Sequence, residues 1–555
     1  MNYKDYKNQK DLIHLKTQDL KLLAEDIKKE LIKICYENNA HLGSNLGVLE
    51  LTISLLKTFD LDENNKIFFD TGHMSYIYKM LTDRKDKFNL IKKQNGISGF
   101  PEFNESKYDY FSAGHSGTAL STAIGYSFDS QVKNLIVIIG DMSFFNSINL
   151  ASLNYLSMNP INNLTIVVND NQMGIDQFKS VIQKKGNLKK ISQAFNLNYF
   201  GPYDGHNFLD LKKVWMLPKV SNKLIHLKTI KGNGLNVKAS PTNFHKVSLK
   251  NENFELKPCF LVNSYLLDIF KNIKFYVLNA GMTSPLCLTS FYKKYPNYAI
   301  DTGMNEEGLF LIASGLILNN QKVVIAIYST FLQRCYDQLV HDIVRNQLNP
   351  LILIDRAGLA FNDGVSHHGI YDVALLKSIS NQIIICQPST QLELKKLMTL
   401  GMHNKKYPFV IRYNNEDLPL NSTSQIQSIG DFILLIKNTA NKKVLITFGP
   451  SVLEGKKIIE SNNLKYDLIN AVFISNHNIK LFNFLINSHY KKVIFYEPIL
   501  NNVGIGSDFL KFLKNKTHNH KIEIYTFENN HICHGDVETI LLQNNMSLKN
   551  ILLSD

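Results

Sequence analysis

The sequence has 555 residues, too many for one hydrophobic core, and its length favours three or four domains. Its 44% hydrophobic and 20% charged residues are typical of a folded protein and exclude a largely disordered chain. The net charge of +13 comes from lysines dispersed along the chain, because arginine occurs only five times, and this favours a lysine-rich solvated surface over a nucleic-acid-binding protein.

The sequence also argues against membrane insertion and secretion. No apolar run approaches the roughly 18 residues that a membrane-spanning helix needs. The first ten residues mix both charges and lack the apolar core of a secretory signal. The six cysteines lie far apart and form no C-x-x-C pair, which argues against a zinc site or a disulfide framework. We therefore expect a cytoplasmic protein with no membrane and no nucleic-acid partner.

The first part of the chain is predicted to alternate helices and strands. A helix is expected over 19–36, where leucine and isoleucine recur at near-helical spacing. Apolar, β-branched runs predict strands at 135–140, 164–168 and 224–229. The pattern then dissolves into polar residues over 241–258, which we interpret as a linker.

Two further series of strands follow. The second series is predicted at 275–278, 323–327, 351–354, 383–386 and 409–412, and the third at 444–448, 468–474, 493–496 and 522–527. A polar stretch at 414–429 is interpreted as a second linker. Strands alternating with helices are typical of parallel α/β layers. We therefore predict an α/β protein of three consecutive parallel-sheet domains, over 1–250, 265–420 and 430–555.

The most informative motif joins the ends of two predicted strands. Gly140-Asp141 ends one strand, and Asn169-Asp-Asn171-Gln-Met173 follows thirty residues after Asp141. The carboxyl edge of a parallel sheet is where such folds bind ligands. Gly-Asp alone is more often a simple turn, but an aspartate, an asparagine and a backbone carbonyl together supply the oxygen ligands that Mg²⁺ prefers.

This motif pair resembles the diphosphate-and-metal motif of thiamine-diphosphate enzymes, and the rest of the chain resembles the deoxyxylulose-phosphate synthase family of transketolase-like enzymes. Similar segments include His41–Leu51, Asp70–His73, Gly114–Thr118, Gly201–His206 and Lys231–Gly234. In the second predicted domain, Tyr328-Ser-Thr-Phe-Leu-Gln-Arg334 and Asp355-Arg-Ala-Gly358 are near-verbatim. The match runs from about residue 19 to the C-terminus and is looser in the third domain.

The resemblance implies a reaction. Pyruvate and D-glyceraldehyde 3-phosphate would be condensed, with loss of CO₂, to 1-deoxy-D-xylulose 5-phosphate, a precursor of isoprenoids, thiamine and pyridoxal. The implied cofactors are thiamine diphosphate and one Mg²⁺ per subunit of a homodimer. The cofactor carries the difficult chemistry, so the protein must anchor the diphosphate, activate the pyrimidine and orient two substrates.

The resemblance also implies site residues. The metal ligands would be Asp141, Asn171 and the carbonyl of Met173. The cofactor contacts would be His73, Gly114, His115, Ser116, Asp141, Asn171, Lys231, Glu306 and Phe331, with Glu306 on the pyrimidine ring. The proton-transferring residues would be Glu306, His41, His73, His245 and His367, since histidine titrates in the required range. The substrate contacts would be Tyr328, Arg334, Arg356, Asp363, His367 and Arg412, among which the arginines suit phosphate or carboxylate.

The chain departs from the family pattern at several positions. Met142 replaces the second glycine of Gly-Asp-Gly, where glycine permits close approach of the backbone to diphosphate. Gly308 stands where the family has histidine, and Asn415 replaces a phosphate-binding arginine. The residues after Met142 also differ from the family's small-residue run.

Two alternatives to an active synthase stay open at this point. One is a sister enzyme of the same fold, such as transketolase or a pyruvate dehydrogenase component. The other is a catalytically weakened homologue that acts as a scaffold or binding protein, for which Met142 and Gly308 are the best arguments. The sequence excludes a serine hydrolase, because Gly114-His-Ser-Gly117 does not fit G-x-S-x-G, and a P-loop enzyme, because the phosphate-binding motif is absent.

Overall fold

The computed structural model of the chain describes residues 1–62, 64–175, 181–184, 186–235, 245–247, 256–420, 426–475, 477–500, 503–528 and 531–554. The chain forms two compact units, Met1–Asn251 and Glu252–Asp555, each of which is described by itself. The predicted linker at 241–258 falls largely outside the described residues, as does part of the one at 414–429.

The first unit is built around a parallel sheet in the strand order β1-β2-β3-β5-β4. Its strands are β1 (Asn65–Phe69), β2 (Asn134–Gly140), β3 (Leu164–Asp170), β4 (Asn198–Asp204) and β5 (Lys223–Lys228). Its helices are α1 (Lys10–Ile13), α2 (Thr17–Glu37), α3 (Gly43–Gly47), α4 (Leu49–Thr58), α5 (Tyr76–Met80), α6 (Ala119–Tyr126), α7 (Ser147–Met158), α8 (Asn187–Ala194) and α9 (Phe208–Trp215). Short 3₁₀ turns are η1 (Tyr3–Asp5), η2 (Lys85–Leu90), η3 (Ser143–Phe145) and η4 (Val181–Gln183).

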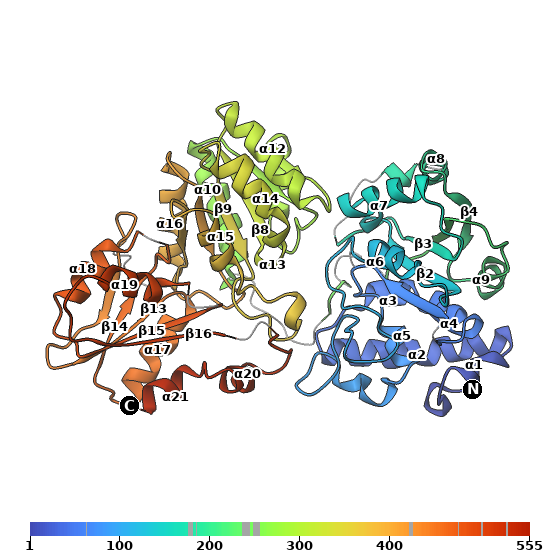
Figure 1. Cartoon of the computed structure of the whole chain (residues 1–555), viewed down its shortest axis with the longest axis horizontal. Coiled ribbons are helices and arrows are strands. Elements are labelled where there is room, and N and C mark those ends of the chain that lie inside the picture. The colour runs from blue at the N-terminus through green and yellow to red at the C-terminus, as the bar shows by residue number, and fades with distance from the viewer. Residues whose placement is uncertain are drawn as a thin grey trace. The chain divides into compact units, whose positions relative to one another are not determined.

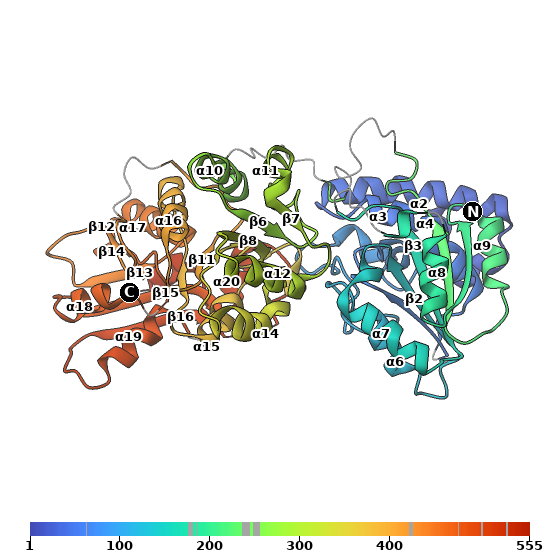
Figure 2. The ribbon, with the colours of Figure 1, turned by 90° about the horizontal axis from the view of Figure 1, so that it is seen from above.

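Both faces of this sheet are buried, which explains why its strands read as continuous apolar runs. Along β2, Ile136 and Ile138 pack with α2, α4, α5 and α9, whereas Leu135, Val137 and Ile139 pack with α6, α7 and α8. Figure 2 shows α2 and α4 on one side of the strands and α6 and α7 on the other. The alternating side chains of one strand therefore serve two separate cores.

The second unit contains two sheets. The first is parallel, in the order β10-β11-β9-β8-β6-β7, with strands β6 (Tyr276–Asn279), β7 (Ala299–Asp301), β8 (Val323–Tyr328), β9 (Leu351–Asp355), β10 (Ile384–Cys386) and β11 (Phe409–Arg412). Its helices are α10 (Pro258–Asn272), α11 (Thr289–Lys294), α12 (Glu306–Leu318), α13 (Ser329–Leu332), α14 (Tyr336–Gln338), α15 (Asp372–Ile379) and α16 (Gln391–His403). Shorter helical turns are η7 (Pro296–Tyr298), η8 (Gln333–Cys335), the π-helical η9 (Leu339–Val344) and η10 (Gly364–Ser366).

The last sheet has the order β12-β14-β13-β15-β16, and β12 runs antiparallel to β14. Its strands are β12 (Ile433–Ile436), β13 (Lys443–Thr447), β14 (Tyr466–Asn470), β15 (Lys492–Leu500) and β16 (Lys521–Phe527). Its helices are α17 (Pro450–Ser461), α18 (Ile479–Ile486), α19 (Ile505–Leu513), α20 (Val537–Gln543) and α21 (Leu548–Leu553). The α/β fold with three consecutive sheets is confirmed, and the last sheet is mixed rather than purely parallel.

The two sheets of the second unit are neighbours (Figure 1) and share one hydrophobic core. Ile325 of β8 and Ile352 of β9 belong to the same buried cluster as Ile446 of β13 and Phe495 of β15. A backbone hydrogen bond also links the two sheets, since Ile474 N donates to Ile385 O at 2.8 Å. The second and third predicted domains therefore pack as one body.

One sequence expectation is wrong. The cysteines were expected to be unpaired, but Cys259 of α10 forms a disulfide with Cys287, with 5.5 Å between their Cα atoms. Packing of α10 against α11, which follows Cys287, brings together two residues that are 28 positions apart. Within the described ranges, no helix is long and apolar enough to cross a membrane, as the sequence predicted.

Candidate active site

Polar loops gather at the carboxyl edge of the first sheet. β1, β2, β3 and β5 are parallel neighbours, so the residues that follow them lie along one edge. Asp70 follows β1, Asp141 follows β2, Asn171 follows β3 and Lys231 comes soon after β5. The edge predicted from the sequence thus holds most of the expected cofactor residues of this unit.

Asp141 is a buried carboxylate with a strongly perturbed acidity. Its main-chain N–H donates to Asn169 O at 3.1 Å, which anchors it to the neighbouring strand. Burial raises the pKa of Asp141 to about 7, and the nearby Asp170 adds to this effect. Hydrogen bonds from the backbone of Met142 and Gln172, and the charge of Lys231, act in the opposite direction. A buried carboxylate of this kind is stabilised by a bound cation.

The turn after β3 lies directly against Asp141, because the backbone of Gln172 hydrogen-bonds its carboxylate. Within this turn, Asn171 Oδ1 accepts a hydrogen bond from Met173 N at 3.0 Å. Lys231 Nζ donates to Gly174 O at 2.6 Å and so closes the turn from the β5 side. The donors present are a carboxylate and amide oxygens, which suit a hard divalent cation. Among the residues described, no three His, Cys, Asp or Glu side chains are arranged to hold a metal ion, so the predicted metal site depends on these amide oxygens.

Asp70 is a further buried carboxylate at this edge, with no role assigned to it from the sequence. It is fully buried, and its carboxylate accepts hydrogen bonds from Gly117 N (2.9 Å), Thr118 N (3.1 Å) and Ser143 Oγ. It therefore ties the predicted His115–Ser116 loop to the residues that follow Asp141. Its signal in the sequence was its place in the family-like segment Asp70–His73.

Gly117 shows how closely these loops approach one another. Its φ is +84°, and a Cβ added there would lie 2.2 Å from Asn146 Oδ1. Asn146 also donates to Ser116 Oγ at 3.3 Å. Met142, the departure from the family's glycine, is 9% exposed and packs into this edge.

Three predicted histidines form a cluster in the first unit. The ring centroids of His41, His73 and His245 lie 5.1–5.5 Å from one another. His73 Nε2 lies 3.0 Å from Ser44 Oγ, and His41 Nδ1 lies 3.3 Å from the hydroxyl of Tyr76. The structure thus brings together side chains that are more than 200 residues apart.

In the second unit, Glu306 begins α12 and is buried. Its side chain is 6% exposed, and Oε2 has no hydrogen-bond partner among the described residues. Burial raises its pKa, and the charge of Arg334 partly opposes this. A buried carboxyl oxygen without a partner costs free energy unless a ligand binds it. Its neighbour Gly308 leaves room for Asn305, whose Oδ1 accepts from Gly308 N at 3.0 Å and caps the helix.

The predicted substrate residues gather at the carboxyl ends of β8 and β9. Tyr328 and Phe331 stack with ring centroids 5.8 Å apart, and Phe331 lies 6.1 Å from His367. The Arg356 guanidinium lies 5.0 Å from the centroid of Tyr328 and pairs with the buried Asp355 at 2.9 Å. Arg356 has a φ of +58°, a conformation that is uncommon for a side-chain-bearing residue and typical of functional sites.

Arg412 has a different environment from the other predicted arginines. It is 1% exposed, and its guanidinium donates to both carboxylate oxygens of Asp372 (2.9 and 3.1 Å), to Gln387 Oε1 (2.6 Å) and to Gly369 O (3.2 Å). These contacts support a structural role that joins β11 to α15. Its predicted contact with substrate stays a prediction.

Asn415, where the family has arginine, is exposed after β11. The positively charged side chain of Lys257 nevertheless lies beside it. Lys257 Nζ donates to Asn415 O at 3.1 Å and pairs with Asp417 at 3.1 Å.

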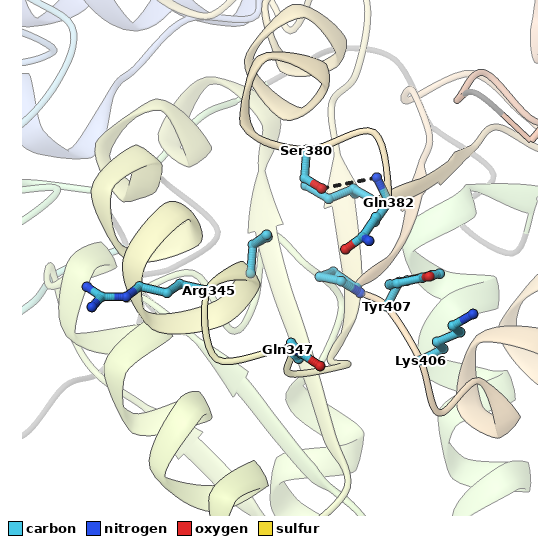
Figure 3. A pocket seen from close by; sticks show the side chains of 9 residues that line it. Arg345, Gln347, Ser380, Gln382, Lys406 and Tyr407 are labelled. Atoms are coloured by element: carbon cyan, nitrogen blue, oxygen red, sulfur yellow. Dashed lines mark hydrogen bonds between the residues drawn. The ribbon is translucent and has the colours of Figure 1, made fainter.

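A pocket of about 310 Å³ lies elsewhere on the second unit (Figure 3). Its lining comes from the segments that precede β9, β10 and β11, at the opposite sheet edge from Arg356. The labelled side chains are Arg345, Gln347, Ser380, Gln382, Lys406 and Tyr407. Ser380 Oγ accepts from Gln382 N at 3.1 Å. None of the residues predicted for the site lines this pocket.

Comparison with known proteins gives a consistent result. The family model described as 1-deoxy-D-xylulose-5-phosphate synthase matches residues 3–183, and the model described as transketolase, pyrimidine binding domain, matches 270–421. A 1-deoxy-D-xylulose-5-phosphate synthase of Malacoplasma penetrans is 33% identical over 99% of this chain and 97% of the relative. The enzyme of that name from Clostridium acetobutylicum is 31% identical over 97% of this chain and 96% of the relative. A solved transketolase from Campylobacter jejuni is 14% identical, with a TM-score of 0.46, over 98% of this chain and all of the other.

Proposed function

The chain belongs to the 1-deoxy-D-xylulose-5-phosphate synthase family, and from this premise we propose that the residues described above carry out the reaction of that family. The protein is a thiamine-diphosphate-dependent transferase. It condenses pyruvate with D-glyceraldehyde 3-phosphate, releasing CO₂, to form 1-deoxy-D-xylulose 5-phosphate for isoprenoid synthesis. When bound, the cofactor supplies the nucleophilic carbon and the electron sink.

The observation that carries the assignment is Glu306. A buried carboxyl with one oxygen lacking a partner among the described residues, at the start of a helix, fits a residue that hydrogen-bonds the pyrimidine ring. Burial raises its pKa above the ordinary value, which favours a carboxyl that can exchange a proton. Phe331, stacked with Tyr328, offers a flat apolar surface for the same ring.

Asp141 and Asn171, together with the carbonyl of Met173, are proposed to hold one Mg²⁺. The cation would neutralise a carboxylate whose pKa is raised to about 7 and would accept further oxygens from the diphosphate. Lys231 supplies positive charge beside them, and the loop of Gly114, His115 and Ser116 is held in place by Asp70.

The histidine cluster is proposed to move protons on the substrates. The rings of His41, His73 and His245 lie 5.1–5.5 Å apart in the first unit, and the ring of His367 lies 6.1 Å from Phe331 in the second unit. Arg356, Arg334 and Asp363 are proposed to bind the substrates, with Arg356 suited to a phosphate or carboxylate.

A homodimer in the cytoplasm is proposed as the working form. Its support is α12, which carries no charge after Glu307 and exposes Leu311, Ile312 and Leu318 by 47%, 41% and 63%. An apolar helix face of this kind is covered in a stable assembly. Sedimentation should give twice the chain mass, and Leu318→Glu should shift it toward the monomer.

The site assignment is tested by product formation from the two substrates with and without Mg²⁺ and thiamine diphosphate. Asp141→Asn should abolish Mg²⁺-dependent product formation. The matched control is Asp204→Asn, since Asp204 also ends a strand of this sheet but is exposed. If Asp141→Asn keeps wild-type product formation, the proposed metal site is wrong.

A further inference from the structure

The loop of residues 358–369, here called the acceptor loop, carries Asp363 and His367. Its base is closed by two backbone hydrogen bonds, Gly358 N to Gly369 O at 2.8 Å and Gly369 N to Gly358 O at 2.7 Å. Inside the loop, Gly364 N donates to Ala360 O at 2.8 Å. From outside the loop, Thr330 Oγ1 donates to Ser366 O at 2.9 Å. The shape that these contacts hold decides where Asp363 and His367 lie.

His368, in this loop, is fully buried and uses both ring nitrogens. Ala360 N–H donates to Nδ1 at 3.0 Å, within the loop. Nε2 lies 2.7 Å from the carbonyl oxygen of Ile532, a residue 164 positions later. A carbonyl can only accept and an amide N–H can only donate, so these partners require a neutral imidazole with its proton on Nε2. Burial lowers the pKa of His368 to about 4, which agrees with a neutral ring.

The segment of residues 531–535, here called the latch segment, touches the acceptor loop at two further points. Gly535 N donates to Phe361 O at 2.9 Å. His534 packs on Gly364 so closely that a Cβ added to Gly364 would lie 3.1 Å from His534 Cβ. The latch segment follows β16 of the last sheet, whereas the acceptor loop follows β9 of the preceding sheet. Three contacts therefore join two sheets of the same unit at one functional loop.

We propose that His368 is a positioning residue for the aldehyde acceptor, because it fixes the acceptor loop to the latch segment and so holds Asp363 and His367 in place. The proposal rests on the function proposed above for these two residues. Through the latch segment, the last sheet and its connections would help to bind the acceptor, although they supply none of the residues assigned to the cofactor.

Two substitutions at His368 separate positioning from simple packing. His368→Phe keeps a ring but leaves Ala360 N and Ile532 O buried without partners, and His368→Gln restores one donor and one acceptor. We expect His368→Phe to raise KM for glyceraldehyde 3-phosphate about ten-fold with KM for pyruvate within two-fold of wild type. His368→Gln should recover most of this loss.

A second pair of variants tests the latch from its other side. Gly535→Pro removes the N–H that binds Phe361 O, and Gly535→Ala is its control. Gly535→Pro should raise KM for glyceraldehyde 3-phosphate, and Gly535→Ala should raise it by a much smaller factor. Hydrogen exchange gives a readout that does not depend on catalysis: peptides covering 358–369 and 531–535 should both exchange faster in His368→Phe and Gly535→Pro.

The proposal is overturned if His368→Phe leaves both KM values unchanged, or raises both equally. It is also overturned if only one of the two peptides exchanges faster. If the wild-type chain forms no product, the proposed function fails, but the exchange of the two peptides still decides whether the latch exists.

Discussion

Replacing Glu306 by glutamine should separate catalysis from stability. The amide keeps the size of the side chain but removes its charge and its ability to exchange a proton. A proton-transferring group contributes about 10²–10⁴ to a rate. This corresponds to about 3–5 kcal/mol of activation free energy, at about 1.4 kcal/mol for each factor of ten.

The same substitution should leave the protein equally or more stable. Burial raises the pKa of Glu306 in the folded state above its ordinary value of 4.5, so the ionised side chain opposes folding. Glutamine removes this cost at pH values above the raised pKa. The gain should shrink as the pH falls toward 4.5, because the wild-type carboxyl is then protonated and neutral as well.

The assay measures kcat with saturating Mg²⁺ and thiamine diphosphate, and the thermal midpoint of the protein without cofactor at pH 8. Glu307→Gln is the matched control, because it removes a half-buried carboxylate from the same turn of α12. We expect kcat to fall at least 100-fold in Glu306→Gln and less than three-fold in Glu307→Gln. A Glu306→Gln variant with wild-type kcat, or equal losses in both variants, would refute the reasoning.

Three other predictions follow from single contacts. The Kd for Mg²⁺, measured by calorimetry, should rise as the pH falls from 8 to 6, because protons compete with the cation for Asp141, whose pKa is raised to about 7. A Kd that stays constant over this pH range would exclude Asp141 as a ligand. Asn415→Arg should lower KM for glyceraldehyde 3-phosphate severalfold and leave KM for pyruvate unchanged. The reason is that a charge-assisted contact with the phosphate contributes about 1.5–3 kcal/mol before solvent screening. An unchanged KM for glyceraldehyde 3-phosphate would place the phosphate elsewhere. Asp109→Asn should destabilise the first unit by about 3–5 kcal/mol in urea unfolding, because it leaves the charge of Arg84 buried without this partner. Arg84 is 3% exposed and pairs with Asp109 at 2.5 Å and with Glu105 at 3.3 Å. A loss of stability below about 1 kcal/mol would show that the ion pair with Glu105 compensates.

Sequence reasoning identified β2, β3 and β5, but missed β1, although Phe68 packs in one core and Ile67 and Phe69 pack in the other. β2 reads as an uninterrupted apolar run because its two faces pack into two cores, and its predicted range, 135–140, differs by one residue from the observed one. β4 was missed because its sequence contains Gly201 and Pro202 and none of its residues is fully buried. β7 and β12 were missed because they are short and partly exposed.

In the candidate site too, some residues could be placed from the sequence and others could not. Asp141 and Asn171 could be placed at one sheet edge because parallel strands end together, and that placement needs only the strand order. The roles of Asp70 and His368 could not be predicted, because their partners lie 47–73 and 164 residues away in sequence. The disulfide of Cys259 was missed for the same reason, since only the packing of α10 and α11 brings Cys287 to it.

The core shared by the last two sheets has a consequence for how the chain folds during synthesis. Residues 1–251 contain both cores of the first sheet, so this unit can bury its apolar surface while the rest of the chain is still being made. β8 and β9 cannot, because their core includes side chains of β13, β15 and α19. β9 ends at Asp355 and α19 at Leu513, so about 160 further residues must be made before this core is complete, and this interval is where a chaperone would be needed.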